Sequence, residues 1–426
     1  MRELKAAIIG AGSTYTPELI EGFIDRKGSL NFQTFYLMDI DKEKLDIVGN
    51  LAERMLKDKG FKGELVLTLN LDEAIADADY IFSQIRVGGM AARIRDEKIP
   101  LKYGLLGQET TGVGGFMNAL RTVPVMLDIA SKIEKLAPDA WLINFSNPSG
   151  IVADALLNHT KVKTLGLCNG PINMLKDISK TIGTTDFDYE YVGLNHLAWI
   201  TSVIIGGKNI LESLKVSSGA KMKNIPAVEY DDELIQAIPA IPSYYLSYYY
   251  LRDQQLKKCL EAEKSRGEVC VEVEEALLNQ YKDPNLKKKP EELALRGGAL
   301  YSTAAVSVVD AIENDKNEYH VVNVKNDGAI PFMQSDDVVE IKCLVNKQGA
   351  KPVQALNCDN RFIIGLMQAV KAYEKLTVSA AMNGSRSDAL SALMVHPLIG
   401  DYNKAIGVLN EMLEANKDYL PNFFNK

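Results

Sequence analysis

Short apolar runs alternate with amphipathic stretches over the first 190 residues of the chain. The runs are too short for helices and lie at residues 6–9, 34–38, 65–69, 80–84 and 141–145 and from residue 163 onward. Helical patterns lie between them, most clearly at 41–59 and 115–136. Six buried strands with helical crossovers predict an α/β fold with a doubly wound parallel sheet of the Rossmann type. Such sheets bind ligands outside the carboxyl ends of their strands.

The alternation stops near residue 190, and the second half of the chain has a mixed pattern. Two runs on either side of Gly206-Gly207, at 201–205 and 209–210, predict a hairpin. Further strands are predicted at 321–324, 338–343 and 352–353, and helices at 261–278, 300–312, 362–376, 388–394 and 402–416. We therefore divide the chain into a nucleotide-binding domain, residues 1–190, and an α+β domain, residues 191–426, packed together without a flexible linker.

Composition and charge narrow the range of partners. The formal net charge is −8 at pH 7 and no basic stripe stands out, which argues against nucleic acid or an anionic membrane surface as a partner. Five widely spaced cysteines favour free thiols in a reducing compartment over a disulfide framework. The sequence has no signal-peptide pattern and no apolar run long enough to span a bilayer. We therefore expect a cytoplasmic protein.

A glycine-rich turn follows the first apolar run and contains Gly10, Gly12, Ser13 and Thr14. Thr16 as N-cap and Pro17 at the first helical position predict that a helix begins directly after it. In a dinucleotide-binding turn, the first glycine permits the bend and the second lets the backbone approach the pyrophosphate. Tyr15 replaces the third glycine of the usual fingerprint, so this turn is weak evidence when taken alone.

Asp39 strengthens the nucleotide hypothesis. It ends the second predicted strand, where a carboxylate can accept hydrogen bonds from the adenosine ribose hydroxyls, and this favours NAD over NADP. The competing interpretation makes Asp39 a helix cap, a duty for which Asp41 is also placed. The run Gly107 to Gly115 has too many glycines for a regular element, and we expect it to be a loop over the cofactor.

Cys168, at the end of the sixth predicted strand, and His196 form a candidate metal-binding pair. Each lies next to an asparagine, in Cys168-Asn169 and Asn195-His196, and the loops around them are uncharged. Thiolate and imidazole both bind divalent ions, and two protein ligands leave coordination positions open for substrate oxygens. The competing interpretation is a buried thiol and a histidine with an ordinary structural role.

Two other strand ends carry polar side chains. Arg86 lies beside glycines, where its guanidinium suits a phosphate or carboxylate, although a surface salt bridge is an equal alternative. Asn147 can present a donor and an acceptor, or act as the N-cap of the next helix. A tyrosine cluster spans residues 244–250, and composition cannot select a catalytic member. Arg266 lies in a charged helical stretch that is typical of a solvated face.

Taken together and in order, these motifs resemble glycoside hydrolase family 4, most closely its 6-phospho-β-glucosidases. The motifs are Gly10-Ala11-Gly12-Ser13, Arg86-Val87-Gly88, Gly107-Gln108-Glu109-Thr110, Asn147-Pro148, Cys168-Asn169, Asn195-His196-Leu197 and Tyr245-Leu246-Ser247-Tyr248-Tyr249. The resemblance covers essentially the whole chain. It implies a dinucleotide-binding domain followed by an α+β substrate and oligomerisation domain, NAD and a divalent metal, usually manganese, and a homodimer or homotetramer.

The resemblance also implies roles for individual residues. Cys168 and His196 match the metal ligands, and Tyr245 matches the catalytic base. Arg86, Asn147 and Arg266 match residues that hold the sugar or its phosphate, although the sequence around Arg266 departs from the usual family form. Members acting on α-linked substrates tend to have aspartate where this chain has Asn169. Because an amide cannot serve as a general acid at neutral pH, Asn169 favours the β-glucoside branch and leaves the general acid unassigned.

The reaction that the resemblance implies is hydrolysis of 6-phospho-β-glucosides, such as cellobiose 6-phosphate, to glucose 6-phosphate and an aglycone. It proceeds by transient oxidation at carbon 3, deprotonation at carbon 2, elimination, water addition and re-reduction, and differs from ordinary two-carboxylate glycosidases. The alternatives within the family are 6-phospho-α-glucosidase, α-glucosidase and α-galacturonidase activities. Outside it, the alternatives are a lactate- or malate-type NAD-dependent dehydrogenase, for which the chain offers no evident His–Asp pair, and a non-catalytic NAD sensor, against which the pair Cys168 and His196 argues.

Overall fold

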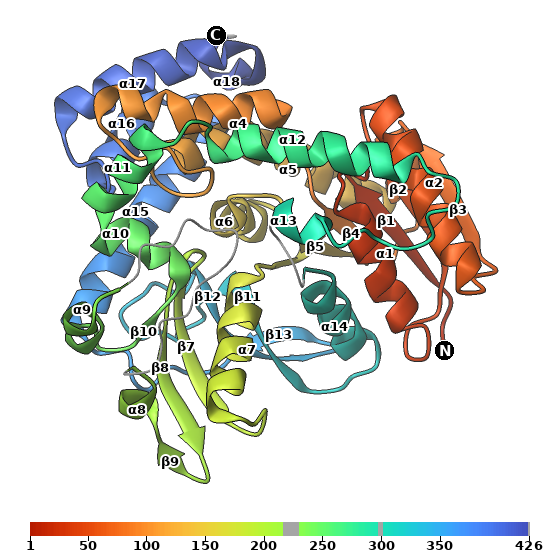
Figure 1. Cartoon of the computed structure of the whole chain (residues 1–426), viewed down its shortest axis with the longest axis horizontal. Coiled ribbons are helices and arrows are strands. Elements are labelled where there is room, and N and C mark those ends of the chain that lie inside the picture. Colours follow the sequence, from red (N-terminus) through yellow and green to blue (C-terminus); the bar gives the residue numbers. More distant parts are fainter. Residues whose placement is uncertain (216–229, 297–300, 425–426) are drawn as a thin grey trace.

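A nine-stranded sheet runs through the centre of the computed structural model, which describes residues 1–215, 230–296 and 301–424 (Figure 1). The strand order is β13-β12-β11-β6-β5-β4-β1-β2-β3. Six of these strands are parallel, namely β1 (Leu4–Ile9), β2 (Phe32–Met38), β3 (Glu64–Thr68), β4 (Tyr80–Ser83), β5 (Trp141–Asn144) and β6 (Lys163–Gly166). They correspond to the six strands predicted from the apolar runs, which confirms the doubly wound parallel sheet.

Both faces of the parallel strands are buried, as continuous apolar strands require. Ala6 and Ile8 of β1 pack in one core cluster, whereas Ala7 and Ile9 pack in another. Residues of α1 (Thr16–Asp25) and α2 (Lys42–Asp58) belong to the first cluster, and α3 (Leu71–Ile75) contributes to the second. Helices α5 (Gly112–Leu136) and α6 (Ser149–His159) contact each other and contribute to both clusters.

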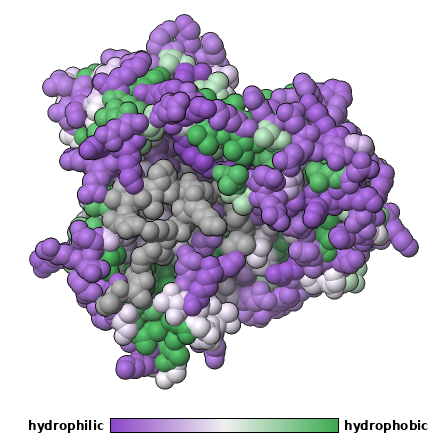
Figure 2. All heavy atoms as spheres, in the orientation of Figure 1, coloured by the Kyte–Doolittle hydropathy of each residue, from purple (hydrophilic) through white to green (hydrophobic). Residues whose placement is uncertain are grey.

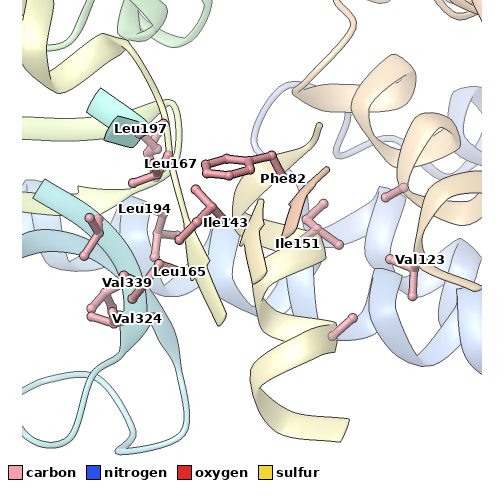
Figure 3. Packing of buried hydrophobic residues seen from close by; sticks show 14 of the residues in the cluster. Phe82, Val123, Ile143, Ile151, Leu165, Leu167, Leu194, Leu197, Val324 and Val339 are labelled. Carbon is pink, nitrogen blue, oxygen red and sulfur yellow. The ribbon is translucent and has the colours of Figure 1, made fainter. Parts of the chain in front are cut away.

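Three antiparallel strands from the second half extend the same sheet. These are β11 (Glu318–Lys325), β12 (Val338–Asn346) and β13 (Gly349–Pro352), and β11 pairs with β6. Figure 3 shows Val324 and Val339 packed near Leu165 and Leu194 in one core. The strands were predicted, but their place in the first sheet was not, so the sheet crosses the predicted domain boundary at residue 190.

The second sheet contains β7 (Asp188–Leu194), β8 (Leu197–Ile205), β9 (Lys208–Asn209) and β10 (Ile241–Pro242). Gly206 and Gly207 both have positive φ and form the predicted hairpin between β8 and β9. A tight turn between β7 and β8 contains Asn195 and His196, and β7 packs against β12. This turn is therefore held between the two sheets.

The remaining helices come from both halves of the chain. They include α4 (Gly89–Lys98), α7 (Gly170–Ile182), α8 (Leu211–Lys215), α9 (Asp232–Ala237), α10 (Ser247–Tyr250), α11 (Arg252–Glu261), α12 (Arg266–Tyr281), α13 (Leu293–Arg296), α14 (Tyr301–Glu313), α15 (Arg361–Asn383), α16 (Arg386–Val395), α17 (Tyr402–Ala415) and α18 (Pro421–Phe424). Figure 1 shows α12 running across α4 toward α2, both of which it contacts. Within the described ranges, no helix is both long and apolar enough to cross a membrane.

Two predicted boundaries near the cavity described below are wrong. Residues 112–115 begin α5 instead of continuing a loop. A Cβ at Gly114 would lie 2.2 Å from the Gln108 carbonyl oxygen, and one at Gly115 would lie 2.4 Å from the Thr110 carbonyl carbon. These glycines thus serve close packing of the helix start. The helix predicted at 261–278 is instead divided between α11 and α12, with Arg266 as the first residue of α12.

Candidate active site

A cavity of about 1020 Å³ lies at the carboxyl ends of the parallel strands. The face drawn in Figure 2 is mostly hydrophilic and is hollowed next to α4 and α12, which contribute to the cavity lining. Most of the predicted site residues line it, namely Gly10, Gly12, Ser13, Asp39, Arg86, Asn147, Asn169, His196, Tyr245 and Arg266. The fold therefore brings together in one cavity residues that are far apart in the sequence.

The turn after β1 has the geometry of a nucleotide-binding turn. Gly10 has a φ of +87°, and a Cβ there would lie 2.9 Å from the carbonyl oxygen of Gln84. Thr14 differs from its neighbours because it is fully buried outside the cavity lining, and its carbonyl oxygen accepts a hydrogen bond of 2.8 Å from Tyr281. Thr16 is already helical and its hydroxyl donates to the Ala11 carbonyl, so the predicted N-cap is one residue late.

Asp39 directly follows β2 and lies beside the same turn. Its carboxylate accepts from the backbone nitrogens of Gly12, at 2.7 Å, and of Asp41, at 2.9 Å. Asp41 is the N-cap of α2 and accepts from the Lys44 nitrogen, so the capping interpretation applies to Asp41 and not to Asp39. Asp39 therefore lies in the cavity where a ribose would be bound in a Rossmann-type fold.

Cys168 and His196 face each other across the turns that follow β6 and β7. Cys168 Sγ lies 3.5 Å from His196 Nε2, and both residues are buried. A divalent ion with a metal–sulfur length of about 2.3 Å and a metal–nitrogen length of about 2.1 Å separates its two donors by roughly 3.1–3.6 Å, depending on the ligand angle. The two side chains thus fit a shared metal ion. Among the described residues, no cluster of three or more His, Cys, Asp or Glu has metal-binding geometry.

Thr110 and Gln108 determine which nitrogen of His196 carries the proton. Thr110 Oγ1 donates to Gln108 Oε1 at 2.8 Å and lies 2.7 Å from His196 Nδ1. Gln108 Oε1 also accepts from the backbone nitrogens of Thr110 and Thr111. With its hydroxyl donating to Gln108, Thr110 Oγ1 accepts from Nδ1–H, and in this tautomer the Nε2 lone pair is directed at Cys168 Sγ. Burial lowers the pKa of His196 to about 3, so the imidazole is neutral.

Cys168 lies in surroundings that favour its protonated form in the absence of a metal. Burial and the carboxylate of Glu340 raise the pKa of the thiol to about 12. Asn195 connects the two groups because its side chain hydrogen-bonds to the sulfur and donates to Glu340 Oε1 at 2.9 Å. Burial also raises the pKa of Glu340, to about 7. A metal ion that binds here must therefore displace the thiol proton.

Tyr245 lies directly against the candidate metal pair. Its ring stacks on that of His196, with 3.6 Å between centroids and 7° between planes. It belongs to a short 3-10 helix, η2 (Tyr244–Leu246), that follows β10. The neighbouring Tyr244 points elsewhere and donates to Asp177 Oδ2 at 2.5 Å, outside the cavity lining. The structure thus separates Tyr245 from its neighbour, as composition could not.

Arg86 forms an ion pair with a carboxylate to which no role could be assigned from the sequence alone. Its guanidinium lies 2.7 Å from Glu109, which is also 3.0 Å from Arg93, and all three residues line the cavity. Burial alone would raise the pKa of Glu109, but Arg93 and Arg86 outweigh it and lower the pKa to about 2. An ionised carboxylate therefore lies among the candidate sugar-binding residues.

The other three predicted substrate-binding residues differ in the contacts that they make within the protein. Asn147 lines the cavity and is not a helix cap, because Pro148 occupies the N-cap position of α6. Asn169 is buried at the start of α7 and its carbonyl oxygen accepts from Asn173. Arg266 lines the cavity, but its Nη2 donates to the carbonyl oxygens of Leu295 and Arg296. Arg266 thus also holds the last residues of α13.

Comparisons with known proteins agree along the whole chain. The family model described as Family 4 glycosyl hydrolase matches residues 5–184, and the model of the Family 4 glycosyl hydrolase C-terminal domain matches residues 191–399. A probable 6-phospho-beta-glucosidase from Bacillus subtilis (strain 168) is 42% identical, covering 99% of this chain and 98% of its own length. A 6-phospho-beta-glucosidase from Escherichia coli (strain K12) is 40% identical, covering 99% and 97%.

Solved structures extend this similarity to the fold. The structure of the 6-phospho-beta glucosidase from Thermotoga maritima with NAD and glucose-6-phosphate has a TM-score of 0.92 and 36% sequence identity, covering 98% of this chain and 99% of that one. A second structure of that enzyme, with manganese, NAD+ and glucose-6-phosphate, has a TM-score of 0.90.

Proposed function

We propose, because this chain belongs to glycosyl hydrolase family 4, that it hydrolyses 6-phospho-β-glucosides to glucose 6-phosphate and an aglycone. The observation that carries the proposal is the placement of His196 and Tyr245 in a cavity that continues to Asp39, with Cys168 Sγ 3.5 Å from His196 Nε2. A nucleotide at one end and a sugar at the other would then meet in a single space. The relatives with 42% and 40% identity carry the matching names.

Cys168 and His196 are the proposed metal ligands, and the turn after β1 with Asp39 is the proposed NAD site. The sulfur-to-nitrogen distance of 3.5 Å fits one divalent ion, and Gly10 and Gly12 pack closely against Gln84 and Asp39 in a turn that lines the cavity. When bound, NAD supplies reversible hydride acceptance at carbon 3 of the sugar, and the metal, proposed to be Mn²⁺, supplies Lewis acidity toward the sugar oxygens.

The side chains of the protein have separate duties in this proposal. Tyr245 takes the proton from carbon 2, which oxidation at carbon 3 makes acidic, and its stacking on His196 fixes the position of the phenol. Arg86, Asn147 and Arg266 bind the sugar or its phosphate. Asn169 contacts the substrate without donating a proton, because an amide is not an acid at neutral pH. Protonation of the leaving group is not assigned to a residue.

The experiment that tests the substrate class compares three glucosides of 4-nitrophenol. They are the β-glucoside 6-phosphate, the α-glucoside 6-phosphate and the unphosphorylated β-glucoside, each assayed with NAD⁺, Mn²⁺ and reductant. We expect turnover of the phosphorylated β-anomer at least tenfold above that of the other two. Equal turnover of the unphosphorylated compound would contradict the phosphate requirement, and faster turnover of the α-anomer would move the enzyme to the α-branch.

Assembly and location are part of the same proposal. We propose a homodimer or homotetramer that is located in the cytoplasm. The five free cysteines and the expected intracellular phosphorylated substrate are in keeping with this location. Light scattering of the purified protein at micromolar concentration measures the mass of the assembly. A mass equal to one chain would contradict the oligomer.

A further inference from the structure

Glu274 reaches from the second half of the chain into the proposed nucleotide end of the cavity. It lies on α12, is buried, and contacts two cations. Its Oε1 lies 2.5 Å from Lys44 Nζ and its Oε2 lies 2.9 Å from Arg296 Nη2. All three residues line the same cavity as Asp39. One carboxylate thus holds two cations at this end of the cavity.

The position of Lys44 places it beside the proposed ribose site. Lys44 lies in the first turn of α2, the helix that follows β2 and Asp39. A Cβ at Gly12 would lie 3.1 Å from Lys44 Cβ and 2.9 Å from Asp39 Oδ2. The side chains of Lys44 and Asp39 therefore both pack against the same face of Gly12.

Arg296 also lies near the glycine-rich turn. Its guanidinium lies 5.1 Å from the centroid of the Tyr15 ring, and Tyr15 follows the glycine-rich turn. Helix α12 is fixed at both ends, because Gly267 N donates to Glu97 at 2.6 Å and Tyr281 donates to the Thr14 carbonyl. The Glu274 carboxylate is thereby held in place on a helix that spans the nucleotide end.

The charges of Glu274, Lys44 and Arg296 determine which nucleotide this end of the cavity can accept. Burial alone would raise the pKa of Glu274, but Arg296 and Lys44 outweigh it and lower the pKa, so the carboxylate is ionised. Lys44 and Arg296 then share one ionised partner, which holds both side chains and compensates one of their two positive charges. A ribose hydroxyl can donate to Asp39, whereas a 2′-phosphate would bring negative charge next to it. Lys44 or Arg296 could bind that phosphate only after its ion pair with Glu274 is broken.

We propose that Glu274 is a specificity-determining residue, which holds Lys44 and Arg296 so that this cavity accepts NAD and rejects the 2′-phosphate of NADP. The inference rests on the proposed use of NAD by this chain. It assigns cofactor discrimination jointly to Asp39, on the first half, and to Glu274, on a helix of the second half.

The test measures binding of NAD⁺ and NADP⁺ to the full-length, metal-free protein by titration calorimetry. Glu274→Gln keeps the shape of the side chain and removes its charge. We expect it to strengthen NADP⁺ binding relative to NAD⁺ by about tenfold, since a freed lysine gains a charge-assisted contact with phosphate. Adding Lys44→Met to this variant should abolish the gain.

Glu275→Gln is the matched control, because Glu275 is the next residue on α12 and is exposed. It removes the same charge from the same helix and should leave the ratio of the two affinities unchanged. If Glu274→Gln does not fold, Lys44→Met alone provides the test. We then expect NADP⁺ and NAD⁺ binding to change equally, because Lys44 is already held by Glu274.

An unchanged affinity ratio in folded Glu274→Gln, or an equal shift in both control and variant, would overturn the inference and leave the proposed function intact. A selective loss of NADP⁺ binding in Lys44→Met would also overturn it, since Lys44 would then already serve the phosphate. Failure of the wild-type chain to bind NAD⁺ would overturn the proposed function together with this inference.

Discussion

Thr110 Oγ1 lies 2.7 Å from His196 Nδ1 while its own proton is directed to Gln108. This contact favours the neutral tautomer of His196 that carries its proton on Nδ1, in which the Nε2 lone pair faces Cys168. Groups that orient a metal-binding histidine through its second nitrogen commonly affect metal affinity and ring orientation. The proposed metal site therefore depends on a loop that precedes it by many residues in the sequence.

Replacing Thr110 should weaken metal binding without removing a ligand. We expect Thr110→Val to raise the dissociation constant for Mn²⁺ by about 10–100-fold, whereas Thr110→Ser, which keeps the hydroxyl, should stay close to wild type. Titration calorimetry measures both constants. Nitrogen-15 shifts of His196 in the metal-free protein report the proton on Nδ1 directly, and a wild-type protein with its proton on Nε2 would contradict the assignment.

Metal binding should release a proton from Cys168. Since burial raises the pKa of this thiol to about 12, the group is protonated at neutral pH, and a thiolate ligand must lose that proton. The apparent affinity for the metal should therefore increase about tenfold for each unit by which the pH increases, as long as the pH stays below the pKa of the thiol. His196 adds nothing to this slope because it is already neutral.

Calorimetry in two buffers of different ionisation enthalpy counts the released protons. We expect about one proton for each Mn²⁺ bound at pH 7.5. Cys168→Ser should abolish this release and the metal-dependent activity, while NAD⁺ binding remains. Binding without proton release in the wild-type protein would exclude a thiolate ligand.

Tyr245 and Tyr244 form a matched pair for testing the proposed base. Tyr245→Phe should lower kcat by at least about a hundredfold with an unchanged fold, because the group that takes the carbon 2 proton is lost. Tyr244→Phe removes only the hydrogen bond to Asp177, at 2.5 Å, and should retain most activity. Deuterium at carbon 2 should exchange with solvent or slow the wild-type reaction. Loss of activity in Tyr244→Phe alone would mean that the base is misassigned by one residue.

The sequence predicted the parallel sheet well because each buried strand is a continuous apolar run bounded by turn residues. The antiparallel strands β11 to β13 were also predicted, but their pairing with β6 depends on contacts between distant residues such as Asn323 and Gly166. Local patterns carry no information about such pairing. The family assignment, made from ordered motifs, is confirmed by the matches over residues 5–184 and 191–399.

Individual site residues were predictable to different degrees. Asp39 was placed correctly at a strand end, because the Rossmann topology fixes that position. Glycines at 112–115 were interpreted as loop residues, since the sequence does not show which backbone atoms press against them. Thr110 and Glu274 were missed: the role of Thr110 depends on the direction of a hydroxyl proton, and that of Glu274 on a helix that packs across the other half of the chain.

The measurement that tests the central claim most directly is hydrolysis of 4-nitrophenyl β-glucoside 6-phosphate by protein stripped of metal and nucleotide. NAD⁺, Mn²⁺ and reductant are added back separately and together, and release of 4-nitrophenol is followed. We predict hydrolysis only when NAD⁺ and Mn²⁺ are both present, with reductant sustaining it by protecting Cys168. Hydrolysis by the stripped protein without NAD⁺ would contradict redox-assisted glycoside cleavage.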